Sequence, residues 1–289
     1  RVTQDNESKG KYAEYYEQTS FLNYPFVKHD ESYTCVNIYV FIRCIENYIY
    51  NNLKSGNPSW FMDSFGKVFE NHLFKGLSHS NERFITDATL KDKLPKGANL
   101  VDYLITGSDY NVFIDAKAVE LPYLGKVSDN PNVILGKVKN SALKAIKQAY
   151  EVNNNLLTLS DDSLPKFKSN NYLLVVTYKE LYLSNGSVFY ESIAGDKVDD
   201  LKKGIDKEAM IPMDNIYFIT LESFELLCSI LNQNNLNIAQ VIEHAKQNDK
   251  EAQSRKFEFN QHIYSLNINV QRPDYLDCSV KQLTDVLKK

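Results

Sequence analysis

The sequence predicts an α/β fold in which a central β-sheet is flanked by helices, with further helical segments at both ends of the chain. Three stretches support this: helical spacing at residues 60–76, an apolar β-hairpin at residues 101–119, and a second apolar strand at residues 172–178. Alternation of helices and apolar strands is typical of α/β domains. The chain has 289 residues, 43% of them hydrophobic, and this is enough to bury one large core.

Composition limits the classes of function. The formal net charge is −4, which is not typical of a protein that coats nucleic acid nonspecifically, so contact with nucleic acid is expected from a local patch or a partner. No apolar run of about 18 residues is present, and we expect no membrane contact. The four cysteines lack paired C-x-x-C spacing, which argues against structural zinc and a disulfide framework and favours a cytoplasmic location.

The N-terminal part, residues 1–59, is expected to be a helical segment outside the core. It begins with Arg1 rather than Met and without a signal-peptide pattern, which is consistent with a truncated chain that lacks an N-terminal domain. Residues 1–33 are polar and predict an irregular lead-in with one short helix. Apolar residues then recur with helical spacing from Tyr33 to Leu53, and we expect their aromatic stripe to lie in the core. The breaker cluster at residues 55–58 ends this helix.

The next helix, residues 60–76, carries a broad apolar side, with Glu70 at its edge. Between residues 78 and 99 the chain is polar, with a short strand predicted at Phe84–Thr86 before the hairpin.

The hairpin at residues 101–119 carries the charged residues that we expect to be functional. If Ser108 and Asp109 form its turn, the register places Asp102 directly opposite Asp115, on the same face of the sheet. Side chains alternate along a strand, so Lys117 shares that face as well. Like charges at directly opposed positions are destabilising, so something positive is expected between the carboxylates.

Two interpretations of this hairpin are open. Asp102, Asp115 and the backbone carbonyl of Ala116 offer oxygen ligands to a hard divalent cation, with Lys117 beside whatever the metal activates. Alternatively, the charges form an exposed ladder of ion pairs. The apolar run around them indicates a buried sheet, where unpaired charge is costly, and this favours the metal site.

These residues resemble the PD-(D/E)xK nuclease superfamily: Asp102, then Asp115-Ala116-Lys117 on the next strand, with Glu70 on a preceding helix. The segment DYNVFIDAKA, residues 109–118, is also similar to the cleavage domains of type IIS restriction enzymes. Val101 stands where the family often has proline. The resemblance implies a restriction-endonuclease-like fold, with a central mixed β-sheet flanked by helices and with helical N- and C-terminal additions. It also implies that Glu70 approaches the metal directly or through water.

A lysine-rich stretch follows the hairpin. Residues 131–150 contain four lysines and no acid, and a helix predicted over residues 139–152 places Lys144 and Gln148 on one face. Some family members place a Lys or Gln from this helix near the scissile phosphate, and Gln148 resembles that residue. The usual Gln-x-x-x-Tyr spacing is not met, because Tyr150 follows too soon. Lys144 and Gln148 are therefore candidate substrate-binding residues, against the simpler view of a solvated helix face.

The remaining elements complete the predicted core, which we bound at residues 60–231. After a loop at residues 153–171 come the strand at residues 172–178, a candidate strand at Ser187–Ile193, a strand at Ile216–Thr220 and a helix at Glu222–Leu231. Residues 232–289 predict a C-terminal helical segment of two or three helices without chemistry of their own.

Together these features predict a Mg²⁺-dependent phosphodiesterase, with Mn²⁺ able to substitute. A DNA endonuclease of restriction or antiphage-defence type is favoured over an enzyme that acts on RNA. The alternative is a catalytically idle nuclease-like fold that serves as a binding or assembly module in a larger complex. Cleavage of both strands normally needs two active sites, so a homodimer or a partner subunit is expected. Targeting is expected from such a partner or from a missing N-terminal domain.

Overall fold

A computed structural model describes residues 21, 24–126, 128–159, 162–269, 271 and 273–288. Its centre is a five-stranded mixed sheet in the order β3-β4-β5-β6-β7. The strands are β3 (Phe84–Thr86), β4 (Tyr103–Thr106), β5 (Tyr110–Lys117), β6 (Asn170–Thr177) and β7 (Ile216–Thr220). The pairs β3/β4 and β4/β5 are antiparallel, whereas β5/β6 and β6/β7 are parallel. The predicted mixed α/β architecture is confirmed at this level.

The hairpin register is the one that the sequence predicts. Tyr103 pairs with Ile114, and Gly107 donates its backbone N–H to the carbonyl of Tyr110 at 2.9 Å. This register puts Asp102, which immediately precedes β4, level with Asp115. Two facing strands and a short turn suffice to fix it, because a slip by one residue would exchange the faces of every side chain.

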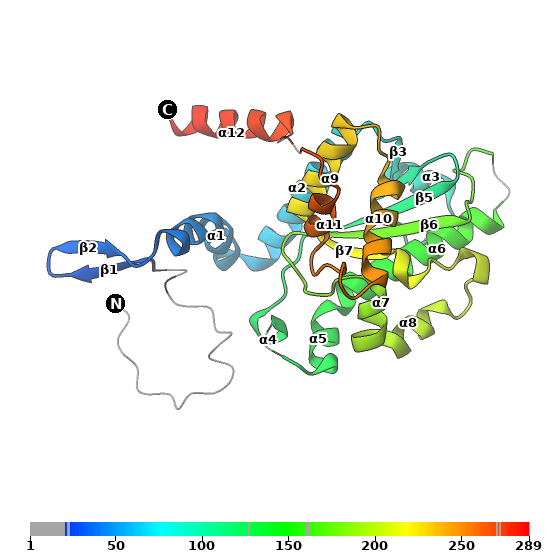
Figure 1. Cartoon of the computed structure of the whole chain (residues 1–289), viewed down its shortest axis with the longest axis horizontal. Helices are drawn as coiled ribbons and strands as arrows, with labels where there is room; N and C mark the ends of the chain where they lie inside the picture. The colour runs from blue at the N-terminus through cyan, green and yellow to red at the C-terminus, as the bar shows by residue number, and fades with distance from the viewer. Residues whose placement is uncertain are drawn as a thin grey trace.

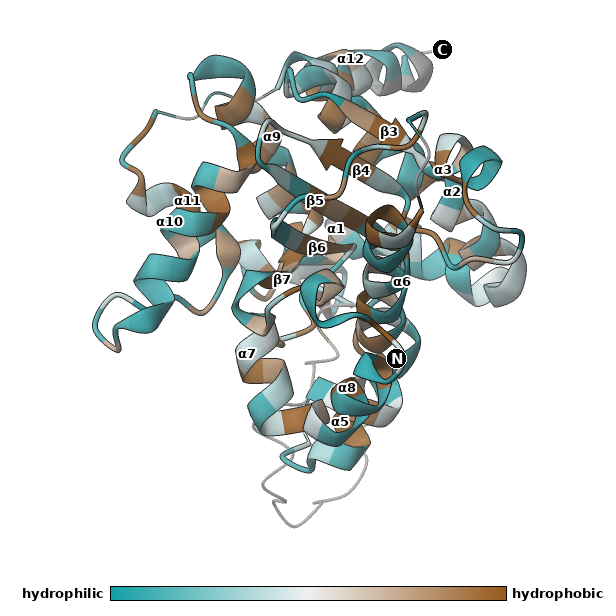
Figure 2. Ribbon diagram, turned by 90° about the vertical axis from the view of Figure 1, so that its right-hand side faces the viewer, coloured by the Kyte–Doolittle hydropathy of each residue, from teal (hydrophilic) through white to brown (hydrophobic). Residues whose placement is uncertain are grey.

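Helices cover both faces of the sheet, and each face has its own core (Figure 2). On one face, Val112, Ile114 and Ala116 pack with α2 (Pro58–His79), α9 (Leu221–Gln233), α10 (Ile238–Lys250) and α11 (Phe259–Ser265). The other face includes Phe113 and packs against α6 (Lys144–Thr158) and α8 (Gly195–Lys202). The remaining α-helices are α3 (Asp87–Lys93), α4 (Tyr123–Lys126), α5 (Pro131–Val138), α7 (Gly186–Phe189) and α12 (Asp274–Leu287).

The N-terminal segment differs from the prediction. A hairpin of β1 (Phe26–His29) and β2 (Ser32–Cys35) precedes α1 (Ile38–Gly56), so the helix begins at Ile38 rather than at Tyr33. The reason is the N-cap: the Asn37 side chain accepts hydrogen bonds from the backbone N–H groups of Tyr39 and Val40. The sequence predicts a lead-in with one short helix over residues 1–33; residues 26–33 lie in this hairpin, and residues 1–20 lie outside the described residues.

The apolar stripe of α1 is exposed, which corrects the expectation that it lies in the core. Ile42, Ile45, Tyr48 and Ile49 are 47–65% exposed. Figure 1 shows why: α1 and the β1/β2 hairpin extend away from the helices that surround the sheet, so most of the helix has no neighbour. The helix is held to the rest of the chain where Lys179 Nζ donates to Asn47 Oδ1 and where Tyr50 is buried against Phe61 of α2.

The candidate strand at Ser187–Ile193 is also wrong. This stretch forms α7 followed by a π-helical turn at Tyr190–Ala194. The Asn185 side chain caps the helix by accepting from the N–H of Val188 at 3.0 Å. Gly186 lies so close to Met213 that a Cβ atom would stand 2.4 Å from the Met213 carbonyl oxygen. The cap at Asn185 and the close packing at Gly186 favour a helix more strongly than the β-branched residues of this stretch favour a strand.

The helix after the hairpin starts earlier and ends later than predicted. It comprises α5, a π-helical segment at Lys139–Leu143, and α6. Pro131 begins α5, a position where its missing N–H costs nothing, and Asn130 caps it.

Candidate active site

The sheet topology brings the three charged residues of the predicted site to one place. Asp102 stands at the start of β4, while Asp115 and Lys117 occupy the carboxyl end of β5. Asp102 Oδ2 accepts a hydrogen bond from the backbone N–H of Ala116 at 2.6 Å, which ties the two strand ends together.

Asp115 is the most buried member, with its side chain fully excluded from solvent. Its Oδ2 forms an ion pair with Lys117 Nζ, whose side chain is 13% exposed. Its Oδ1 is buried and accepts no hydrogen bond from the described residues. A buried carboxylate oxygen without a donor is costly, and a proton held between Asp115 and Asp102 or a cation would offset that cost.

Burial raises the pKa of both carboxyl groups, Asp102 and Asp115. Burial raises the pKa of Asp115, Lys117 opposes that rise, and the nearby Asp102 adds to it. Burial also raises the pKa of Asp102, against the lowering effects of the Ala116 N–H and of Lys117. Two carboxyl groups that act on each other in this way titrate as a coupled pair.

Glu70 joins this group from α2. Its backbone carbonyl accepts from the hydroxyl of Tyr103 at 2.7 Å, so the helix is fixed against β4 at this point. The side chain is exposed. Partial burial and the charges of Asp102 and Asp87 raise the pKa of Glu70, and Lys117 lowers it. The approach of Glu70 to a metal, directly or through water, stays a prediction.

Gln148 contacts the site, whereas Lys144 does not. Gln148 Oε1 accepts from Lys117 Nζ at 3.2 Å, and its Nε2 donates to the carbonyl of Leu100. The amide therefore bridges the lysine to the segment before β4. Lys144 lies one turn earlier on α6 with an exposed side chain.

Asp87 is a further carboxylate that sequence reasoning missed. It begins α3 directly after β3 and donates its backbone N–H to the carbonyl of Asp102 at 2.9 Å. Its charge raises the pKa values of Asp102 and Glu70. The signal was available: antiparallel pairing of Phe84–Thr86 with Tyr103–Ile105 places the next residue, Asp87, level with Asp102.

The side chains of Asp102, Asp115 and Glu70 carry oxygen donors of the type that divalent cations bind. As they stand, no three His, Cys, Asp or Glu side chains in the described ranges form a group that could hold a metal ion, and the Lys117 ammonium supplies the positive charge beside Asp115. Oxygen donors are nevertheless what Mg²⁺ and Mn²⁺ prefer. Asp115, Asp102 and Glu70 supply carboxylate oxygens, which are donors of this kind.

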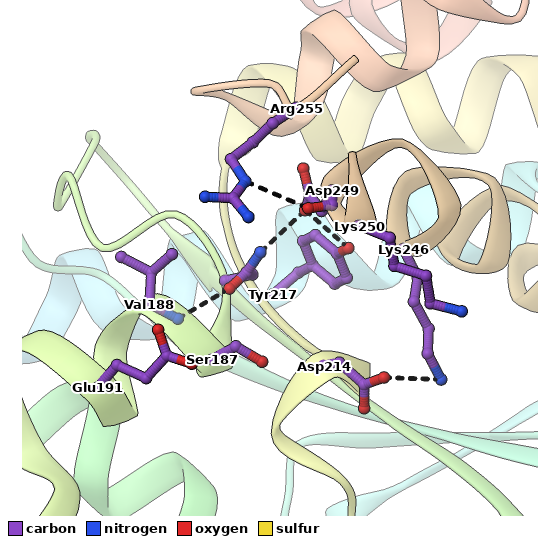
Figure 3. A pocket seen from close by; sticks show the side chains of 10 residues that line it. Ser187, Val188, Glu191, Asp214, Tyr217, Lys246, Asp249, Lys250 and Arg255 are labelled. Carbon is purple, nitrogen blue, oxygen red and sulfur yellow. Dashed lines mark hydrogen bonds and ion pairs between the residues drawn. The ribbon is translucent and has the colours of Figure 1, made fainter. Parts of the chain in front are cut away.

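A polar pocket of about 180 Å³ lies elsewhere, between α7, β7 and α10, and contains none of the predicted site residues (Figure 3). Several of its polar groups pair with one another. Asp249 Oδ2 accepts from Asn185 Nδ2 at 2.8 Å and from the Tyr217 hydroxyl at 3.0 Å, and Lys246 pairs with Asp214 at 3.2 Å. These hydrogen bonds and this ion pair connect α7, β7 and α10, and we assign the network a structural role.

Comparison of the chain with protein-family models, with curated proteins and with solved structures found no match. Among the described helices, none is both long and apolar enough to cross a lipid bilayer.

Proposed function

We propose that this protein is a metal-dependent nuclease that hydrolyses phosphodiester bonds, most readily as a DNA endonuclease of restriction or antiphage-defence type with a restriction-endonuclease-like core. The observation that carries the proposal is the meeting of Asp102, Asp115 and Lys117 at one end of β4 and β5. Buried like charges held together are costly for a fold, and a catalytic site is the usual reason for them.

Each residue has a distinct part in this proposal. Asp102 and Asp115, with Glu70 and the Ala116 carbonyl, would hold Mg²⁺ or Mn²⁺, which supplies a Lewis acid for the scissile phosphate and for water activation. Lys117 would donate from Nζ to the attacking water or to a phosphate oxygen and offset the negative charge that develops in the transition state.

Gln148 is a positioning residue for Lys117. Its amide oxygen accepts from the ammonium while its nitrogen is held by the Leu100 carbonyl. The ammonium is thereby fixed between Asp115 and α6 before substrate arrives. Such preorganisation is what makes a charged donor effective in catalysis. Lys144, exposed one turn away, is proposed to contact the nucleic-acid backbone as a sequence-independent phosphate ligand.

The test is incubation of the protein with linear and circular DNA, and with RNA, in Mg²⁺, in Mn²⁺ and in EDTA. We expect cleavage of DNA that requires the cation and is abolished in Asp115→Asn and Lys117→Met. The matched control for Lys117→Met is Lys246→Met, because Lys246 is 17% exposed against 13% for Lys117 and forms an ion pair outside the site. Asp214→Asn, which removes the more exposed carboxylate of that pair, is a control for the loss of an acid elsewhere. Full activity in Asp115→Asn, in protein shown to be folded, would end the assignment.

A catalytically idle module is the second candidate, and one observation favours it: Lys117 already neutralises Asp115, and no ligand set is assembled in the described part of the chain. Thermal unfolding with increasing Mg²⁺ or Mn²⁺ separates the two. A nuclease should be stabilised by cation, since a ligand that binds only the folded state shifts unfolding by about 2.7 kcal/mol at one hundred times its Kd. An idle module should show no shift that depends on Asp115.

A further inference from the structure

Two lysines and one glutamate form a cluster immediately beyond the candidate active site. Lys54 comes from the last turn of α1, Glu120 follows β5, and Lys179 follows β6. The backbone connects this cluster to Lys117: Tyr178 donates its N–H to the Lys117 carbonyl at 3.3 Å, and Lys179 donates to the Val119 carbonyl at 3.4 Å. The lysine cluster (Lys54, Glu120 and Lys179) therefore adjoins the carboxyl end of β5.

One carboxylate is shared by both ammonium groups. Lys54 Nζ pairs with Glu120 Oε1, and Lys179 Nζ lies 3.7 Å from Glu120 Oε2. The three side chains are 34%, 31% and 23% exposed for Lys54, Lys179 and Glu120, so an anion from solvent can reach them. With two cations around one anion, the cluster carries a net positive charge in a chain whose overall charge is −4.

The stacked rings of Tyr50 and Tyr178 make cation–π contacts with the two ammonium groups. Each lies 5.3 Å from the centroid of the Tyr50 ring, and Lys179 also lies 5.5 Å from the Tyr178 ring. The Tyr50 and Tyr178 rings stack at 4.9 Å, and Tyr50 is buried. Cation–π contacts of this kind orient an ammonium without neutralising it, so its charge remains available to a ligand.

The two ammonium groups repel each other. Burial lowers the pKa of Lys179, Glu120 opposes this change, and the charges of Lys126 and Lys54 lower it further. An additional anion would relieve the repulsion between the ammonium groups of Lys54 and Lys179. A phosphate diester suits them, because lysines commonly contact backbone phosphates without reading sequence.

We propose that Lys54 and Lys179 form a subsite for a backbone phosphate of the nucleic-acid strand, next to the phosphate that is cleaved. The inference rests on the proposed nuclease function and names how its substrate is held. It also gives α1 a part in substrate binding, since the helix supplies Lys54.

A purely structural ion-pair tie between α1 and the core makes the opposite prediction at Glu120. If the lysines bind phosphate, Glu120→Gln removes a competing anion and should tighten binding. If Glu120 only ties α1 to the core, the same substitution should loosen the helix and leave nucleic-acid affinity unchanged or weaker.

The experiment measures binding of a fluorescent DNA oligonucleotide by anisotropy, at several salt concentrations, in the cleavage-blocked Asp115→Asn background without Mg²⁺. We expect Lys54→Gln and Lys179→Gln each to weaken binding roughly fivefold, to lower the slope of log affinity against log salt by about 1, and Glu120→Gln to strengthen binding. The matched control is Lys197→Gln, an exposed lysine paired with Asp200 on α8, which should leave affinity unchanged.

The outcomes separate this inference from the proposed function. If the Asp115→Asn protein binds neither DNA nor RNA and the wild-type protein does not cleave them, the nuclease proposal fails. If DNA is bound or cleaved but both lysine variants, shown to be folded by circular dichroism, bind as tightly as their background, the subsite is refuted. Unchanged or weaker binding in Glu120→Gln would also refute it, and a lower melting temperature of that variant would identify the structural tie.

Discussion

Removal of the Lys117 ammonium should destabilise the protein because it leaves a buried charge without its partner. Asp115 is fully buried, its Oδ1 accepts no hydrogen bond from the described residues, and its Oδ2 pairs with Lys117. Removing one partner of a buried ion pair costs about 3–5 kcal/mol. Lys117 retains some solvent contact, so we expect Lys117→Met to lower the free energy of unfolding by about 3 kcal/mol, at the lower end of that range. Methionine keeps most of the apolar stem, so the loss reports mainly on the charge.

A double-mutant cycle tests this reasoning. Asp115→Asn in the Lys117→Met background removes the unpaired charge and should restore about 2 kcal/mol, so the two single effects are not additive. Urea unfolding followed by circular dichroism measures all four proteins. A divalent cation should also stabilise Lys117→Met more than wild type, since it replaces the lost positive charge. Additive single effects would show that Lys117 and Asp115 are not energetically coupled and would refute the interpretation of the site.

Three further predictions concern the fold. Ile42→Glu on the exposed stripe of α1 should change the free energy of unfolding by less than about 0.5 kcal/mol, whereas Ile146→Ala, fully buried in α6, should cost about 3 kcal/mol; equal effects in urea unfolding would contradict the exposure of α1. Gly76→Ala should destabilise by about 1–2 kcal/mol, because a Cβ there would lie 2.8 Å from the Phe224 ring; a higher melting temperature would show that the ring yields. Gly97→Ala should cost about 1 kcal/mol, because its φ of +85° is unfavourable for a side chain although no atom lies nearby; unchanged unfolding would count against that backbone conformation.

The part of the site that could be predicted is the part that depends on local geometry. Once Ser108 and Asp109 form the turn, strand pairing and alternation of side chains determine that Asp102, Asp115 and Lys117 share a face. No knowledge of the rest of the fold is needed for that inference. The apolar character of Tyr172–Thr177 similarly suffices for a central strand, because a parallel strand covered on both faces is apolar throughout.

What could not be predicted depends on contacts between distant segments. The stripe of α1 has the spacing of a core helix, yet whether such a stripe is covered depends on where the helix lies, and the β1/β2 hairpin and α1 extend away from the sheet. The contact of Gln148 with Lys117 joins residues 31 positions apart and follows from how α6 packs on the sheet. Helical spacing alone placed Gln148 and Lys144 on one face without showing which of them reaches the strand.

The order of the strands explains why acids and lysines meet at this end of the sheet. β5 runs antiparallel to β4 and parallel to β6, so the start of β4 and the ends of β5 and β6 coincide. Asp102 therefore enters beside Asp115, and the chain leaves β6 at Lys179, beside the exit of β5 at Lys117. One end of the sheet thus offers carboxylates to a cation and ammonium groups to an anion. A phosphodiester with a bound divalent cation presents the two complementary charges, and this pairing is the physical reason to expect a nucleic-acid backbone there rather than a cation alone.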